Sequence, residues 1–254
     1  MEFSYFGGSS DEVLPDVTMR WLPTWGTTSI SGIVADFQRT KAAGVNKAIL
    51  SIDWLLYNNT SPVTYKGKAI AQRNVHQVLA FLHAYGLLGM VKVLYPIDEP
   101  ERDSNVGEAD LIACNADLIE VCALYPELAQ VKLGVIYGDH EDYRALASYN
   151  GPGGGLVGVD SYGQGSDILS GIYARLEPLL APSQAMIVVP GGASPWRQNP
   201  APFLAWAQTH NVGLFCAFLW DDQWGGTQNL GIRSNGMHPV YAAVAAAIKA
   251  QLTA

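Results

Sequence analysis

Charged residues are scarce in this sequence, and positive ones are scarcer than negative ones. Only 15% of the 254 residues are charged, Lys and Arg number 15 against 23 Asp and Glu, and the formal net charge is -8 at pH 7. Binding to nucleic acid needs clustered Lys and Arg to neutralise phosphates, so we expect no nucleic-acid partner. No run of 18 or more apolar residues occurs, so we expect no membrane partner either.

Residues and motifs that would support metal, cofactor or nucleophile chemistry are also few. The three cysteines, Cys114, Cys122 and Cys216, form no CxxC pair and read as small buried thiols. His140 and His238 lack metal-ligand spacing, and we predict no metal and no cofactor. No G-x-S-x-G elbow or glycine-rich dinucleotide fingerprint is present, which argues against a serine hydrolase and a Rossmann domain.

No signal peptide opens the chain. If Met1-Glu2-Phe3 stands in place of a native leader, a secreted or periplasmic location is compatible with the sequence. We expect a monomer.

Strand-like and helix-like segments alternate along the whole chain. Apolar runs at 17–22, 47–52, 88–95, 131–137, 156–159, 186–189 and 212–219 predict strands, and 3–6 is a weaker first strand. Helical patterns lie at 31–44, 69–85, 109–124, 168–180, 202–210 and 240–252, and the glycine-rich segment 151–155 reads as a connection, since it precedes a strand rather than a helix. Such alternation predicts an α/β protein with a parallel sheet. Eight strands fit a (β/α)8 TIM barrel better than an open sheet. We therefore predict a single barrel domain over residues 1–254, with an irregular first strand.

The stretch from Val91 to Pro100 carries the clearest chemistry. An apolar run ends in Pro96, and Asp98 and Glu99 follow at once. Proline cannot donate to a sheet ladder, so the strand should end there and leave two carboxylates at its carboxyl end, where barrels place their active sites. The alternative interpretation is a solvated pair in a surface loop.

Aromatic and acidic residues gather in the segments that follow the predicted strands. Five of the seven tryptophans fall there, which random core filling does not explain. Rings that pack on sugar C–H faces, beside acids that bond hydroxyls, suit a carbohydrate substrate. The alternative is that Trp54 and Trp220 only plug the end of the barrel. The segments contain Trp25, Asp53, Trp54, Asp98, Glu99, Tyr137, Asp139, Asp160, Tyr162, Trp196, Trp220, Asp221, Asp222 and Trp224.

Carboxylates are also what glycoside hydrolysis needs, because one protonates the leaving oxygen and another attacks or activates water. We expect Glu99 to be the acid, since apolar walls and Asp98 would raise its pKa. Asp98-Glu99-Pro100, after predicted strand four, resembles the Asn-Glu-Pro motif of the large clan of retaining (β/α)8 glycoside hydrolases. The resemblance implies that Glu99 is the acid/base and that Trp220 is a sugar platform, while Asp98 replaces the usual Asn.

One departure from that clan affects the functional prediction. The clan's nucleophile is a Glu after strand seven, but here that place holds Pro190-Gly191-Gly192-Ala193. Either Asp160, or after it Asp221 or Asp139, supplies the second carboxylate, or the barrel binds carbohydrate without cleaving it. A barrel enzyme for phosphorylated metabolites ranks lower, since no basic residues gather after the strands.

Overall fold

The computed structural model has the predicted (β/α)8 barrel fold. It describes residues 1–6, 16–22, 29–58, 63–101, 106–138, 142–160, 169–194, 196–222 and 230–253. The barrel strands are β1 (Glu2–Tyr5), β2 (Arg20–Leu22), β3 (Ala48–Ser51), β6 (Val91–Tyr95), β7 (Lys132–Tyr137), β8 (Gly155–Asp160), β9 (Gln184–Val189) and β10 (Val212–Ala217). They form one eight-stranded sheet in the order β1-β10-β9-β8-β7-β6-β3-β2, and all neighbours are parallel.

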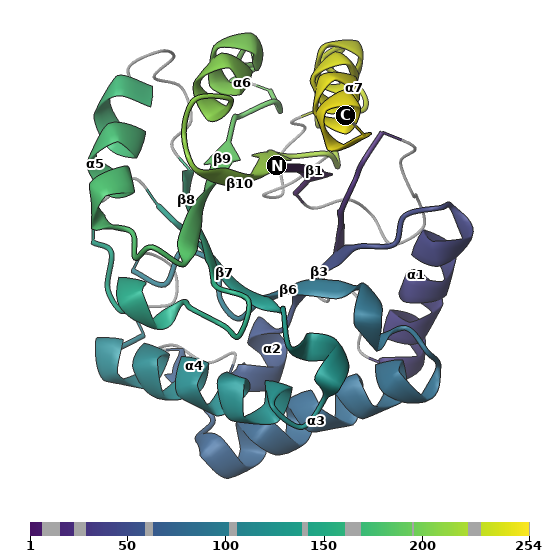
Figure 1. Ribbon diagram of the computed structural model, residues 1–254, viewed down its shortest axis with the longest axis vertical. Helices are drawn as coiled ribbons and strands as arrows, with labels where there is room; N and C mark the ends of the chain where they lie inside the picture. The colour runs from purple at the N-terminus through teal and green to yellow at the C-terminus, as the bar shows by residue number, and fades with distance from the viewer. Residues whose placement is uncertain are drawn as a thin grey trace.

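Helices surround the ring of strands (Figure 1). They are α1 (Ile30–Ala42), α2 (Asp53–Leu56), α3 (Lys68–Ala84), α4 (Glu108–Cys122), α5 (Ala174–Leu176), α6 (Ala201–Ala207) and α7 (His238–Thr253). A small antiparallel hairpin, β4 (Tyr57–Asn58) with β5 (Thr64–Tyr65), lies between α2 and α3 in the sequence.

The irregular place in the barrel is the seam between β1 and β2 rather than β1 itself. β1 pairs in register with β10 over its whole length. Across the seam, the amides of Thr18 and Met19 both donate to the Phe3 carbonyl, at 3.0 and 3.2 Å. The Phe3 amide donates to the Thr18 hydroxyl at 2.7 Å. A side chain therefore replaces part of the backbone ladder where the barrel closes.

Several predicted elements differ in their bounds or type from the observed ones. The helix predicted at 168–180 is a π-helical turn (Leu169–Tyr173), one turn of α5 and a 3₁₀ turn (Glu177–Leu179), because Pro178 has no N–H to continue an α-helix. The strand predicted from 88 begins at Val91 after a 3₁₀ turn. The helix predicted from 31 begins at Ile30 as α1, and Ser29 caps it, accepting from the Gly32 amide at 3.2 Å. The last strand ends at Ala217 rather than at residue 219.

Two apolar clusters hold the fold together. One fills the barrel, and the other packs the outer side of the strands against the helices. Inside, Ile136, Gly158 and Ile187 lie in one register row of β7, β8 and β9. A Cβ on Gly158 would lie 2.9 Å from the Ile187 Cβ, so this glycine leaves the space that the flanking isoleucines fill. Each fully buried isoleucine contributes about 1.5–3 kcal/mol to folding.

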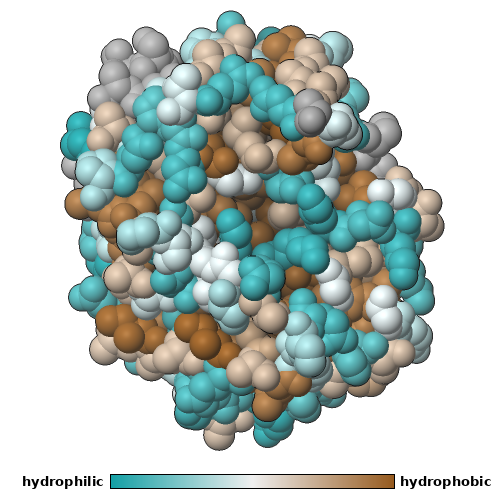
Figure 2. All heavy atoms as spheres, viewed as in Figure 1, coloured by the Kyte–Doolittle hydropathy of each residue, from teal (hydrophilic) through white to brown (hydrophobic). Residues whose placement is uncertain are grey.

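The face shown in Figure 2 carries small apolar groups scattered among hydrophilic ones. Among the described residues, no helix is both long and apolar enough to cross a membrane. The three cysteines are free and buried, as predicted.

Candidate functional site

Asp98 and Glu99 lie at the carboxyl end of β6, joined to the neighbouring strand β7. β6 ends at Tyr95, directly before Pro96, as the sequence predicts. The chain then pairs again with β7: Asp98 bridges to Ile136, and the Glu99 amide donates to the Ile136 carbonyl at 3.0 Å. Both acidic residues are half-buried. Their backbone is therefore held by the barrel, unlike that of a freely solvated loop.

Tyr95 links β6 to Asp98 from inside the barrel. Its side chain belongs to the inner apolar cluster and is 1% exposed. Its hydroxyl donates a hydrogen bond to Asp98 Oδ1 and accepts one from the Ile136 amide at 3.2 Å. Burial, with the nearby carboxylates of Asp98 and Asp160, raises the pKa of Tyr95 well above its ordinary value. Sequence reasoning missed this residue, because inside an apolar strand it reads as core.

Asp160 is the last residue of β8 and is half-buried. The pKa values of Tyr95 and Tyr173 are raised mainly by the burial of these side chains. The nearby charge of Asp160 adds to the rise at both tyrosines. Asp98 bridges to β7, and β7 pairs with β8, so these two predicted carboxylates lie at the carboxyl end of the barrel on either side of β7.

Glu101 is a further carboxylate at this end that sequence reasoning did not select. Its Oε1 accepts a short hydrogen bond from the Gly138 amide after β7. Burial, followed by the nearby charges of Glu99 and Asp142, raises its pKa, while hydrogen bonds oppose the rise. The signal was available, because Glu101 follows Pro100 directly, so three of four consecutive residues are acidic.

Asp53 and Trp54 begin the short helix α2 that follows β3. Burial raises the pKa of Asp53, and backbone hydrogen bonds, followed by the Lys66 ammonium, partly offset the rise. Lys66 Nζ also donates to the Trp54 carbonyl at 2.6 Å. The half-buried Trp54 ring packs against the outer apolar cluster, on the helix side of the strands.

Two predicted aromatic residues face the helices instead of the barrel interior. Trp220 is 2% exposed and packs against Tyr5 and His238, with ring centroids 4.8 and 5.0 Å away. Tyr137 is fully buried in the outer cluster, and its hydroxyl donates to the Arg144 carbonyl at 2.7 Å. In these positions neither ring offers a face to a ligand.

Trp196 takes a different position. It is half-buried over the inner cluster, with Phe218 beside it at a centroid distance of 6.0 Å. Phe218 in turn lies 5.4 Å from Phe6, the residue after β1. An aromatic group therefore lies across the carboxyl ends of β9, β10 and β1. Phe218 was missed because the strand was predicted to continue past it.

Beyond β10, Asp221 and Asp222 form ion pairs with Arg233, at 3.6 and 3.2 Å. Asp222 also accepts from the Gly231 amide and the Ser234 hydroxyl, at 2.7 and 2.6 Å. These bonds fold the segment back on itself, which accounts for the position of Asp222. The other predicted site residues, Trp25, Asp139, Tyr162 and Trp224, lie outside the described residues, as does His140.

The end of β9 is closely packed. A Cβ on Gly192 would lie 2.5 Å from Ile232 Cδ1 and 2.8 Å from Tyr241 Cε2. A longer side chain at this position would therefore need its neighbours to move.

Basic residues line the opposite mouth of the barrel. Lys47, Lys92 and Lys132 border a hollow of about 340 Å³ at the amino ends of the strands. Lys47 pairs with Glu2 at 2.5 Å. Within the described ranges, no group of three or more His, Cys, Asp or Glu could hold a metal ion. His238 Nε2 instead lies 3.2 Å from Asp16 Oδ2.

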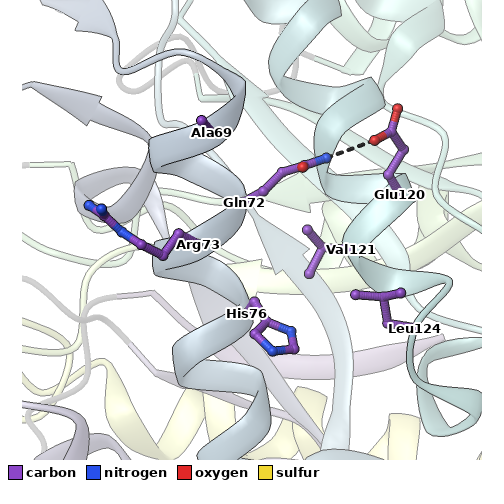
Figure 3. Close-up of a pocket in the computed structure, with 7 residues that line it drawn as sticks. All are labelled: Ala69, Gln72, Arg73, His76, Glu120, Val121 and Leu124. Carbon is purple, nitrogen blue, oxygen red and sulfur yellow. Dashed lines mark hydrogen bonds between the residues drawn. The ribbon is translucent and has the colours of Figure 1, made fainter.

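A groove of about 420 Å³ lies between α3 and the end of α4 (Figure 3). Gln72 bonds to Glu120 across it at 2.8 Å, with His76 further along α3. None of the described site residues predicted from the sequence lines this groove, so it is separate from the carboxylates at the end of the barrel.

Comparison with known proteins identifies the fold. No protein-family model and no curated protein matches the sequence. Among solved structures, a GH113 β-1,4-mannanase is similar with a TM-score of 0.54 and 10% identity, covering 96% of this chain and 97% of the mannanase. A fungal β-1,4-galactanase structure gives 0.57 and 11%, covering 86% and 83%. A Bacillus subtilis mannanase gives 0.51 and 16%, covering 91% and 82%. At these identities the likeness establishes a shared (β/α)8 fold.

Proposed function

We propose that this protein is a glycoside hydrolase that acts on a polysaccharide or glycan. The observation that supports the proposal is that Asp98, Glu99 and Asp160 lie at the carboxyl ends of β6 and β8, at the same end of the barrel as the half-buried rings of Trp196 and Phe218. The carboxyl end is where barrel enzymes hold their active sites. The fold shared with mannanases and galactanases agrees with it.

In this proposal Glu99 is the general acid/base and Asp160 the first candidate for the second carboxylate. Glu99 follows β6 and Asp160 ends β8, two strands further around the ring. The distance between the two carboxyl groups sets the mechanism. About 5–5.5 Å implies a covalent glycosyl intermediate, and about 6.5–9.5 Å leaves space for an attacking water.

Trp196 and Phe218 supply the apolar part of the sugar site. Half-buried rings over the inner cluster can stack on the C–H face of a pyranose while the acids bond its hydroxyls. Trp220 has no part in this site, because its ring is buried against Tyr5 and His238.

A barrel that binds carbohydrate without cleaving it is the second candidate. It is favoured by the end of β9, where the retaining clan carries its nucleophile and this chain has Gly192 packed against Ile232 and Tyr241. Under this alternative the aromatic residues bind the sugar and the carboxylates only bond its hydroxyls.

A hydrolysis screen on β-linked mannans, galactans and other polysaccharides, with detection of new reducing ends, separates the two candidates. Turnover supports the hydrolase, and binding without turnover supports the second candidate. On a substrate that the parent protein cleaves, Glu99→Gln should lower kcat about 10²- to 10⁴-fold, because removing a general acid typically has that effect.

Glu120→Gln is the matched control. Glu120 lies on the exposed side of α4 and pairs with Lys68 at 2.6 Å, away from the barrel end. This variant should keep parental turnover. Near-parental activity of Glu99→Gln would refute the role of Glu99.

A further inference from the structure

Tyr95 and its two hydrogen bonds form a chain with a fixed direction. The Ile136 amide can only donate, so at 3.2 Å it uses the Tyr95 oxygen as an acceptor. The single hydroxyl proton of Tyr95 is then directed to Asp98 Oδ1. A carboxyl oxygen that accepts from a phenol is best satisfied when it is ionised, because bonds to a charged acceptor are about twice as strong.

The Tyr95 ring has little freedom to leave this position. Its centroid lies 4.6 Å from that of Trp21 in an edge-to-face arrangement. Gly134, the inward residue of β7 next to it, has no side chain. A Cβ there would lie 3.3 Å from Tyr95 Cδ2 and 2.9 Å from Val93 Cγ1. Because Gly134 has no side chain, the Tyr95 ring has room to lie where its hydroxyl reaches Asp98.

The groups around Asp98 come from several strands. Tyr95 belongs to β6, Asp160 to β8 and Cys216 to β10, while Glu99 is the next residue in the chain. Burial, and then Asp98, raises the pKa of the Cys216 thiol, so this thiol stays neutral. Burial and the two aspartates do the same for the Tyr95 phenol, which therefore stays a donor across the working pH range. Among these groups, Tyr95 donates to Asp98 through a hydroxyl that stays neutral.

We propose that Tyr95 is a positioning residue that holds Asp98 as an ionised carboxylate facing the barrel interior. The contribution of Tyr95 to catalysis rests on the proposed hydrolase function. In that reaction the Asp98 anion stabilises the positive charge that develops on the sugar ring, while Glu99 carries the proton. The arrangement assigns different tasks to two adjacent acids, and it gives Asp98 a role that an Asn at this position would not have.

The pH dependence of turnover tests this role. In Tyr95→Phe the ring remains and the hydroxyl is lost, so kcat should fall about 10- to 100-fold with a smaller change in KM. The acidic limb of the kcat profile should move about one to two pH units upward, because Asp98 protonates more readily once the Tyr95 hydroxyl is lost. Tyr241→Phe is the control, since this buried tyrosine donates only to the Gln198 carbonyl, at 3.1 Å. It should leave the limb in place, and an unmoved limb in Tyr95→Phe would overturn the proposal.

Titration of the carboxyl groups by carbon-13 NMR, without substrate, separates this inference from the proposed function. The Asp98 signal is identified as the one missing in Asp98→Asn. Its midpoint should move upward in Tyr95→Phe and stay in place in Tyr241→Phe. That result with no hydrolysis of any substrate would support the Tyr95–Asp98 coupling and refute the hydrolase. An unmoved midpoint in an active enzyme would overturn the coupling and leave the hydrolase standing.

Discussion

Glu99 occupies a backbone conformation that favours glycine, and this gives a stability prediction at the proposed catalytic residue. Its φ is 38°, yet its amide still bonds to the Ile136 carbonyl at 3.0 Å. For residues with a Cβ, the left-handed region costs about 1–2 kcal/mol, and glycine pays almost none of it. Strain of this kind is typical of functional sites, where activity rather than stability selects the residue.

The comparison of Glu99→Gly with Glu99→Ala isolates the backbone cost, because both variants lose the carboxyl group. Glycine should gain the 1–2 kcal/mol but lose about 0.4–1 kcal/mol through the larger entropy of its unfolded chain. At the midpoints of these two ranges, Glu99→Gly is more stable than Glu99→Ala by about 0.8 kcal/mol. For a chain of this length, that corresponds to a Tm higher by about 1–4 °C.

Thermal and urea unfolding of the two variants measures this difference, and both variants should lose at least about 10²-fold in turnover. Arg197 provides a matched pair, because its φ is 45° and it has no proposed role in catalysis. The free energy of unfolding of Arg197→Gly should exceed that of Arg197→Ala by a similar margin. If the Arg197 pair shows the gain and the Glu99 pair does not, Glu99 is unstrained and the reasoning is wrong.

Two further predictions concern the ends of β9 and β7. Gly192→Ala should lower the free energy of unfolding by about 1–3 kcal/mol, because its Cβ would meet Ile232 at 2.5 Å, and an unchanged urea midpoint would show that the site has room. Burial raises the pKa of Glu101, so its contribution to stability is present at low pH and lost as the pH rises through the folded pKa. Glu101→Gln is neutral at every pH and can still accept from the Gly138 amide. Its stability relative to the parent should therefore increase as the pH rises above about 4, and a constant difference in urea unfolding would contradict this.

Much of the fold follows from local pattern. Apolar runs separated by helical segments can bury both sides of each strand only in a parallel sheet covered by helices, and eight such runs close into a barrel. The end of β6 follows from Pro96, which has no N–H for the ladder. These features depend on neighbouring residues in the chain, so the sequence predicts them. The mixed helix at 169–179 was missed, although Pro178 signalled its interruption.

The sequence by itself determined the barrel and the strand ends at which the acids collect; only the tertiary structure decided which side chains meet there. β7 is apolar along nearly its whole length, so alternation cannot tell which of its residues face inward, and Tyr137 proved to face the helices. Trp220 lies beyond the last strand residue, where the turn of the chain sets its direction toward Tyr5. The Tyr95–Asp98 contact likewise depends on the space left by Gly134 on the next strand. Contacts between strands distant in sequence are set by packing, which a local pattern does not encode.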